Sequence, residues 1–406
     1  MNEIVWGIIV FTVIVLTLSI TVLVARTLLL PAHATSVIVN GERSLVARTG
    51  QKLLDVLLDS GIAIPSACAG VGSCGLCRVK VTKGGGEVLP IEMARLTRQE
   101  IRADTRLACQ VMLRRNVEVS IPEELSRAEA FECRVIATRT LSPLIREIVL
   151  EPPEGQRFQH RAGAFVQITA PAYQLDFAEI KIEPDYRKAW NKLGLCRLIA
   201  QSKNPVMRAY SIANRPQDEG RIVLFIRLAV PPPRAADAPP GIVSSYLFGL
   251  RVGDKVTVSG PYGTFGAMDT DREMIFIGGG VGMAPLRAII FDQLVRIGTS
   301  RRMSFWYGVR SRIDLFHIDD LEVLAHRYDN FRIITALSDP ASGDAWDGPT
   351  GFIHAVVYEN YLKSHPAPEE CEYYLCGPPL MIQSVLSMLD ECGVGETSIF
   401  FDDFGS

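Results

Sequence analysis

Three thiols lie within the ten residues Cys68-Ala69-Gly70-Val71-Gly72-Ser73-Cys74-Gly75-Leu76-Cys77, and Cys109 follows after 31 residues. Two irons bridged by two sulfides need four protein ligands, and one tight loop can supply three of them. Glycines between the thiols let the backbone fold back, so that its N–H groups point at the sulfurs. The spacing therefore predicts a 2Fe–2S cluster held by Cys68, Cys74, Cys77 and Cys109.

A structural zinc site is the alternative use of these four cysteines. Zinc sites usually present two separated C-x2-C pairs, whereas this loop has one such pair and two single cysteines. Rieske ligation is excluded within the loop because it contains no histidine. The spacing favours the cluster over zinc.

The flanking sequence predicts a small α+β domain around the cysteine loop. Strand patterns at 37–39 and 44–47 enclose the turn Asn40-Gly41, a helical pattern covers 52–58, and 78–81 alternates like a strand. Residues 34–126 resemble a plant-type ferredoxin, a β-grasp fold, although the first cysteine gap is five residues rather than four. The resemblance implies that all four cysteines are cluster ligands.

The amino end carries a membrane-length apolar run. Ile4 to Val24 contains no charged residue over 21 positions, which corresponds to about 31 Å of helix, the thickness of a bilayer core. A cleaved signal peptide is the alternative, since Ala32-His33-Ala34 offers a cleavage site, but the run is too long and no basic residue precedes it. We expect residues 1–33 to be a retained single-pass anchor and linker, with Arg26 weakly placing the rest on the cytoplasmic side.

Composition narrows the class of partner. The 406 residues carry a net charge of −3 and no basic tract, which argues against nucleic acid as a partner. Beyond the ferredoxin-like segment, strand patterns recur between turn signals at 165–169, 196–200, 209–212 and 222–228. They predict an antiparallel β-barrel domain over residues 127–268. The stretch Pro171 to Pro205 reads as an insertion with no assigned role.

Two motifs in the barrel segment predict a flavin site. Arg208-Ala209-Tyr210-Ser211 places a guanidinium and an aromatic ring on one face of a strand, suited to a pyrophosphate and a flavin ring. The tetrapeptide alone is weak, because most such sequences are only strand residues. It resembles the R-x-Y-S motif of the ferredoxin–NADP reductase superfamily, and the helix start at Gly241, Ser244 and Ser245 fits that family's G-x-x-S-x-x-L. The resemblance implies FAD, with Ser211 at a flavin ring atom.

From residue 269 strands and helices alternate, which predicts a doubly wound α/β domain over 269–406. A strand at 274–277 runs into a glycine turn and a helix start, where dinucleotide phosphates can approach the backbone. A strand-to-helix turn without a ligand is the alternative. The turn departs from G-x-G-x-x-G but fits the reductase family's G-G-x-G-x-x-P, which implies NADH contacts at Gly279, Gly280, Gly282 and Met283.

Later motifs complete the nucleotide site. The resemblance implies that the Cys in Cys376-Gly377-Pro378 lies beside the nicotinamide, while a buried structural Cys is the alternative. Ser338-Asp339 stands where NADPH-dependent members typically have Ser-Arg, so we expect NADH. The resemblance also makes Phe404 a candidate to stack on the flavin, with core packing as the alternative. Cys376, Phe404 and Ser211 are the residues expected nearest the chemistry.

Cofactor chemistry orders the relay. NADH gives two electrons as hydride, a 2Fe–2S cluster takes one at a time, and flavin can do both, so electrons should pass from NADH through FAD to the cluster. The whole chain resembles the NADH-accepting component of the sodium-translocating NADH:quinone oxidoreductase family. This implies electron entry into a respiratory complex of the bacterial inner membrane, with sodium transport and ubiquinone reduction by partner subunits. An oxygenase reductase component is the second interpretation, and a diaphorase without a fixed partner is the third.

Overall fold

The residues that the computed structural model describes are 2–29, 33–62, 64–66, 68, 70–122, 130–231, 238–343 and 345–402. Contacts divide the chain into two units: Met1–Ile64 with Cys77–Ser126, and Pro65–Leu76 with Arg127–Ser406. Each unit has its own buried apolar clusters. The two units are therefore described separately.

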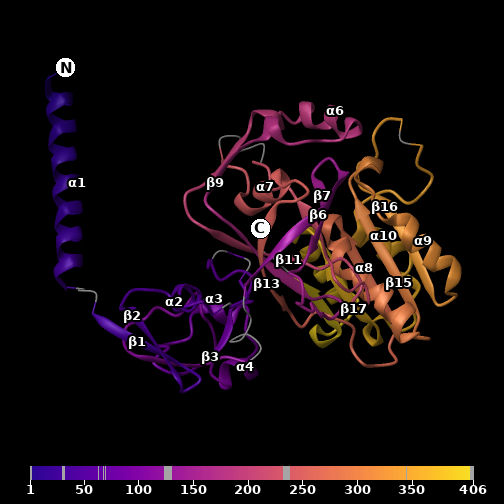
Figure 1. Cartoon of the computed structure of the whole chain (residues 1–406), viewed down its shortest axis with the longest axis horizontal. Coiled ribbons are helices and arrows are strands. Elements are labelled where there is room, and N and C mark those ends of the chain that lie inside the picture. The colour runs from indigo at the N-terminus through magenta and orange to yellow at the C-terminus, as the bar shows by residue number, and fades with distance from the viewer. Residues whose placement is uncertain are drawn as a thin grey trace. The chain divides into compact units, whose positions relative to one another are not determined.

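The amino-terminal helix α1 spans Asn2–Leu29 (Figure 1, indigo). Its described side chains include Trp6, Phe11 and Leu18, which are all exposed. Within the described residues, no helix combines the length and the apolar character needed to cross a membrane.

A five-stranded mixed sheet forms the core of the first unit, in the order β2-β1-β5-β3-β4. Its strands are β1 (Ala34–Val39), β2 (Arg43–Arg48), β3 (Arg78–Lys83), β4 (Thr105–Leu107) and β5 (Val117–Ser120). The helix α2 (Leu53–Asp59) buries its leucines against this sheet. The predicted hairpin is confirmed, with Asn40 and Gly41 in left-handed conformations at its turn.

A buried ion pair ties the connections of this unit together. Arg106 on β4 donates to both carboxylate oxygens of Glu92, which lies in the short helix α3 (Pro90–Met93). The Glu92 side chain is fully buried and that of Arg106 is 6% exposed. Arg106 also donates to the carbonyls of Gly85, Gly86 and Glu87. One buried guanidinium thus binds both Glu92 and three successive carbonyls of the loop that precedes α3.

The second unit begins with a six-stranded antiparallel sheet in the order β11-β8-β13-β6-β7-β12. Its strands are β6 (Phe131–Ser142), β7 (Ile145–Glu151), β8 (Phe165–Ala170), β11 (Val206–Ser211), β12 (Ile222–Arg227) and β13 (Lys255–Tyr262). An antiparallel bridge between Ile212 and Leu224 joins the two ends of this row. The sheet therefore closes around an apolar core, which confirms the predicted barrel.

The insertion has a defined structure made of β9 (Tyr173–Asp176), α6 (Pro184–Lys192) and β10 (Ile199–Ser202). The expected strand over 196–200 is wrong in its first half, because Gly194 turns left-handed and Leu195–Arg197 forms a 3₁₀ turn. Trp190 is buried and its indole N–H donates to the Pro143 carbonyl over 2.6 Å. Tyr173 donates from its hydroxyl to the Ile242 carbonyl. The insertion therefore packs onto the barrel.

The carboxyl-terminal part is a parallel five-stranded sheet in the order β16-β15-β14-β17-β18 (Figure 1, orange to yellow). Its strands are β14 (Met274–Gly279), β15 (Met303–Val309), β16 (Phe331–Leu337), β17 (Glu372–Cys376) and β18 (Ile399–Asp402). Helices α8 (Met283–Phe291) and α9 (Ile318–Arg327) cover one face, while α10 (Ile353–Asn360) and α11 (Pro379–Glu391) cover the other. The predicted doubly wound fold is confirmed.

Candidate active site

A cavity of about 1230 Å³ lies within the second unit, between the barrel and the parallel sheet. Its lining includes residues of β11 and of the start of α7 (Ile242–Gly249) on the barrel side. On the other side it includes the carboxyl ends of β14 and β17. Ligands of open parallel sheets bind at this edge. The position therefore fits a site shared by a flavin and a nucleotide.

Strand β11 presents the predicted flavin residues to the cavity. Arg208, Tyr210 and Ser211 all line it. No ion pair to Arg208 is found among the described residues, and its Nη1 donates to the Met207 carbonyl over 2.7 Å. Burial raises the pKa of the Tyr210 hydroxyl, so this ring stays neutral. A guanidinium with remaining donors beside an uncharged aromatic ring suits a pyrophosphate and a flavin ring.

The start of α7 forms the second part of the barrel side. Gly241 and Ser244 line the cavity. A Cβ on Gly241 would come within 2.6 Å of the Ala229 Cβ, so only glycine fits this approach. The Ser244 hydroxyl donates to the Gly241 carbonyl and accepts from the Ala229 N–H, both over 3.2 Å. Ser245 is fully buried and is not a lining residue.

The glycine turn after β14 forms the nucleotide side. Gly279, Gly280 and Gly282 line the cavity, and a Cβ on Gly282 would lie 1.9 Å from the Cys376 carbonyl oxygen. This contact holds the turn against the end of β17. Met283 does not line the cavity, because it is fully buried in the core beneath α8. Its side chain packs the helix instead.

The end of β17 brings the remaining predicted residues to the same cavity. Cys376, Gly377 and Pro378 line it, and Cys376 is 5% exposed. In the parallel register Cys376 lies beside Asp402 on β18, which also lines the cavity. Phe404, the predicted flavin-stacking residue, lies outside the described residues.

The residues predicted to contact the adenosine of NADH follow β16. Ser338 lines the cavity, whereas Asp339 is exposed and is not a lining residue. The Asp339 N–H donates to the Arg310 carbonyl over 2.7 Å. Sequence reasoning missed Arg310 and Leu193, which both line the cavity. Leu193 comes from the insertion, and no local motif marks either residue.

The predicted cluster cysteines are divided between the two units: Cys68 and Cys74 lie in the second unit, and Cys77 and Cys109 lie in the first. The Sγ atoms of Cys68 and Cys74 are 3.3 Å apart, and the Gly72 N–H donates to the Cys68 sulfur over 3.3 Å. Gly70, Gly72 and Gly75 all have positive φ, which lets the loop fold back as its spacing predicts. The donor set and the N–H directed at sulfur fit an iron–sulfur cluster.

The two cysteines of the first unit lie next to strands of its sheet: Cys77 immediately precedes β3, and Cys109 follows β4 after Ala108. Cys77 and Cys109 are 1% and 0% exposed. The Ala108 N–H donates to the Cys77 carbonyl over 2.8 Å, which places these segments side by side. The Gln110 amide donates to the Cys109 sulfur over 3.2 Å. Both cysteines are therefore shielded from water.

Models of three protein families match the chain in the order of these sites. A 2Fe-2S iron-sulfur cluster binding domain matches residues 37–114. An oxidoreductase FAD-binding domain matches 195–266, and an oxidoreductase NAD-binding domain matches 276–387. FAD, a 2Fe–2S cluster and NADH are thus the cofactors and substrate of the matched domains.

Full-length relatives extend the match to the whole chain. The F subunit of the Na(+)-translocating NADH-quinone reductase of Neisseria meningitidis is 48% identical over 403 residues, covering 99% of this chain and all of the relative. The F subunit of the Klebsiella pneumoniae enzyme is also 48% identical, over 405 residues with the same coverage. Among solved structures, an Amycolatopsis cytochrome P450 reductase superimposes with a TM-score of 0.62 at 24% identity, covering 91% of this chain and 98% of that one. That last likeness shows the fold alone.

Proposed function

The chain belongs to the family of F subunits of the Na(+)-translocating NADH-quinone reductase, and from this premise we propose which of its residues carry electrons in from NADH. It is the flavin-dependent NADH dehydrogenase component, with FAD and 2Fe–2S domains. The observation that carries the proposal is one cavity lined by both the β11 motif and the glycine turn. A hydride donor and its acceptor must meet in one enclosed space, and this cavity provides it.

The nucleotide side of the cavity positions NADH. Backbone N–H groups of the turn Gly279-Gly280-Val281-Gly282 and the start of α8 face the phosphates. Cys376, at the end of β17, packs beside the nicotinamide and orients the ring, without forming a covalent bond to it. Ser338 contacts the adenosine ribose, and the exposed carboxylate of the neighbouring Asp339 disfavours a 2′-phosphate.

The barrel side holds the flavin. Arg208 neutralises the pyrophosphate, the Tyr210 ring packs on the isoalloxazine, and Ser211 donates a hydrogen bond to a ring atom. Gly241 and Ser244 supply the close backbone approach at the start of α7, and buried Ser245 packs behind it. Flavin, when bound, accepts hydride and releases single electrons. Phe404 is proposed as the residue that covers the flavin until NADH enters.

A 2Fe–2S cluster, when bound, would accept the electrons one at a time. We assign Cys68, Cys74, Cys77 and Cys109 as its ligands. Only Gly75 and Leu76 separate Cys74 from Cys77 in the chain. The Gly72 N–H, directed at the Cys68 sulfur, would stabilise the cluster's negative charge. A zinc site would leave the NADH and flavin cavity without a one-electron acceptor.

The chain is proposed to work at the bacterial inner membrane within a larger complex. Supporting this, Ile4 to Val24 contains no charged residue, and the relatives are subunits of a sodium-translocating quinone reductase. In this proposal 1–33 anchors the chain, 34–126 carries the cluster, 127–268 binds FAD and 269–406 binds NADH. Partner subunits reduce ubiquinone and move sodium. The full-length relatives described above favour this role over that of an oxygenase reductase.

The test is an anaerobic NADH titration of the purified full chain. NADH should bleach the FAD absorbance and then produce the EPR signal of a reduced 2Fe–2S cluster. Cys68→Ala should abolish that signal while FAD reduction by NADH continues, because the flavin site does not contain this thiol. Persistence of the signal in Cys68→Ala would remove Cys68 from the ligand set. Absence of iron and sulfide from flavin-loaded wild-type protein would overturn the relay.

A further inference from the structure

Three metal-ligating side chains meet at the opposite end of the parallel sheet from the cavity. Glu273 immediately precedes β14, Cys371 immediately precedes β17, and His365 follows a 3₁₀ turn after α10. The cavity lies at the other end of these strands, and β14 alone spans about 17 Å at the usual rise per residue. None of the three residues lines the cavity. This group of three side chains is therefore separate from the redox site.

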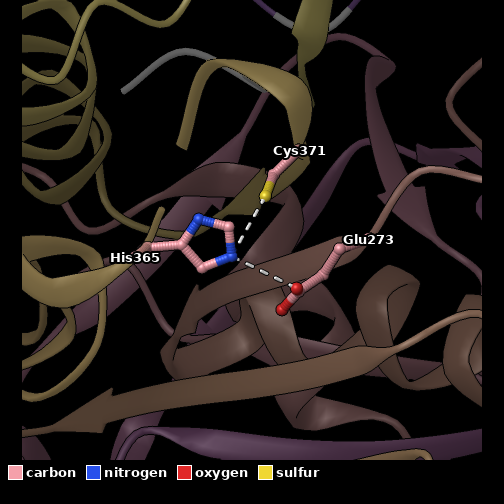
Figure 2. A group of neighbouring side chains, drawn as sticks. All are labelled: Glu273, His365 and Cys371. Carbon is pink, nitrogen blue, oxygen red and sulfur yellow. Dashed lines mark hydrogen bonds and ion pairs between the residues drawn. The ribbon is translucent and has the colours of Figure 1, made fainter. Parts of the chain in front are cut away.

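Figure 2 shows the three side chains pointing toward one another around the His365 ring. The His365 Nε2 lies 3.4 Å from a Glu273 carboxylate oxygen and 3.8 Å from the Cys371 sulfur. All three donor atoms lie within 4.8 Å of one another. Tetrahedral zinc with ordinary bond lengths separates such N–O and N–S pairs by about 3.3 and 3.6 Å. The two separations from the His365 Nε2 are therefore within a few tenths of an ångström of those in a tetrahedral site.

We propose that Glu273, His365 and Cys371 form a binding site for one divalent cation of the zinc class. Imidazole, thiolate and carboxylate together are the donor set that such borderline-soft cations prefer. Three protein ligands leave a fourth position for water.

The three proposed ligands are more buried than an ordinary group of surface side chains. The side chains of His365 and Glu273 are 9% and 12% exposed, and Cys371 is 2% exposed. Two arginines lie close to the group: Arg272 donates from Nη2 to the Cys371 carbonyl over 3.0 Å, and the Arg302 Nη1 is 3.8 Å from Glu273, with the Arg302 side chain 69% exposed. Tyr361 donates from its hydroxyl to the other Glu273 oxygen. An arginine this exposed can swing aside and leave the carboxylate to a bound ion.

Binding requires a change in protonation at two side chains. The Ala367 N–H donates to the His365 Nδ1 over 3.2 Å, so the ring proton sits on Nε2 and points toward Glu273. A cation at Nε2 moves that proton to Nδ1, and the Ala367 amide turns away. The Cys371 thiol gives its proton to solvent, so one proton leaves per cation bound.

The main energetic cost of binding lies at Cys371, because its thiol must lose a proton to become a ligand. Burial, followed by the charge of Glu273, raises the pKa of the Cys371 thiol to about 12. The thiol is therefore protonated at neutral pH unless a cation compensates the thiolate. A bound ion would also link the amino ends of β14 and β17, which are already joined by the Glu372 N–H donating to the Glu273 carbonyl.

The test uses the full chain with FAD and cluster loaded, exposed to Zn²⁺ and then desalted. We expect one zinc per chain beyond the iron content. Zinc K-edge absorption should give one sulfur at about 2.3 Å together with nitrogen and oxygen ligands at about 2.0 Å. Cys371→Ser should lose the sulfur shell, and both it and His365→Gln should weaken zinc binding more than about tenfold.

Cys196→Ser is the matched control, because Cys196 is exposed and lies in the insertion. It should leave zinc stoichiometry and the sulfur shell unchanged. Unaltered flavin and iron contents verify that each variant is folded. Three or four sulfurs around zinc would place the ion at the cluster cysteines and overturn the proposal. Failure of the wild-type chain to retain zinc, or an unchanged sulfur shell in Cys371→Ser, would overturn it equally.

Discussion

Gly282→Ala should slow NADH oxidation while leaving flavin binding unchanged. The added Cβ would lie 1.9 Å from the Cys376 carbonyl oxygen and 2.3 Å from its carbonyl carbon. Real Cβ atoms essentially never approach closer than 3.0 Å, so the glycine turn and the end of β17 must separate by about 1 Å. Neither partner can yield by rotating a side chain, because both atoms belong to backbone.

The size of the effect follows from this displacement. Cys376 and Gly282 are both proposed to position the nucleotide, and a misplacement of about 1 Å costs on the order of 100-fold in rate. We therefore expect kcat/KM for NADH to fall about 100-fold, which corresponds to about 2.7 kcal/mol. The overpacking should also destabilise the domain by about 1–3 kcal/mol. Flavin content should be retained, since β11 and α7 are not displaced.

The assay is stopped-flow reduction of bound FAD by NADH under anaerobic conditions. Gly280→Ala is the matched control, because Gly280 lies in the same turn and a Cβ there would meet nothing within 4 Å. Its φ of +54° makes alanine cost about 1–2 kcal/mol in backbone strain, without pushing on β17. Equal FAD reduction rates in Gly282→Ala and wild type would refute the steric reasoning. Equal losses in the two variants would show that backbone strain, and not the Cys376 contact, controls the rate.

Three further changes test other parts of the molecule. Arg208→Leu should lower the FAD content of the purified chain at least tenfold, because losing a charged hydrogen bond costs about 1.5–3 kcal/mol. Arg157→Leu is the control, because Arg157 is exposed. A full flavin complement in Arg208→Leu would remove Arg208 from the site. Glu92→Gln should cost about 3–5 kcal/mol at neutral pH by leaving buried Arg106 without its partner, measured by denaturant unfolding. Burial acts to raise the pKa of Glu92, but hydrogen bonds from Arg106 and from backbone N–H groups outweigh it and lower the pKa below 4.5; the wild type should therefore lose this stability as the pH falls below about 4.5, and Glu92→Gln should not. Deleting residues 1–33 should yield a chain that stays in the supernatant without detergent and still oxidises NADH, whereas pelleting of the truncated chain with membranes would contradict the proposed anchor.

Residues that act through the backbone could be predicted from sequence. The cysteine loop, the turn at Asn40-Gly41 and the glycine turn after β14 each depend on spacing and on positive φ or close approach, which glycine signals directly. Arg208 and Tyr210 were also predictable, since alternate residues of a strand share a face. Their presence in the cavity agrees with that interpretation.

Side chains whose role depends on packing could not be placed in this way. Met283 fits the family motif by position, yet its side chain fills the core under α8. Ser245 likewise turns inward while its neighbour Ser244 lines the cavity. Leu193 reaches the cavity from a segment 15 residues before Arg208 in sequence, through a fold of the insertion that has no sequence signature. Tertiary contacts decided each of these cases.

The hydrogen bonds between the insertion and the barrel have a consequence for the flavin-free protein. Tyr173 donates a hydrogen bond to the carbonyl of Ile242, the first residue of α7. Trp190 donates to the carbonyl of Pro143 and so attaches the insertion to the β6–β7 turn. The proposed pyrophosphate site at the start of α7 is thus held in place by protein contacts that need no cofactor. After FAD is removed, this site should keep its structure. FAD should then rebind quickly, because little conformational entropy of the protein is lost on binding.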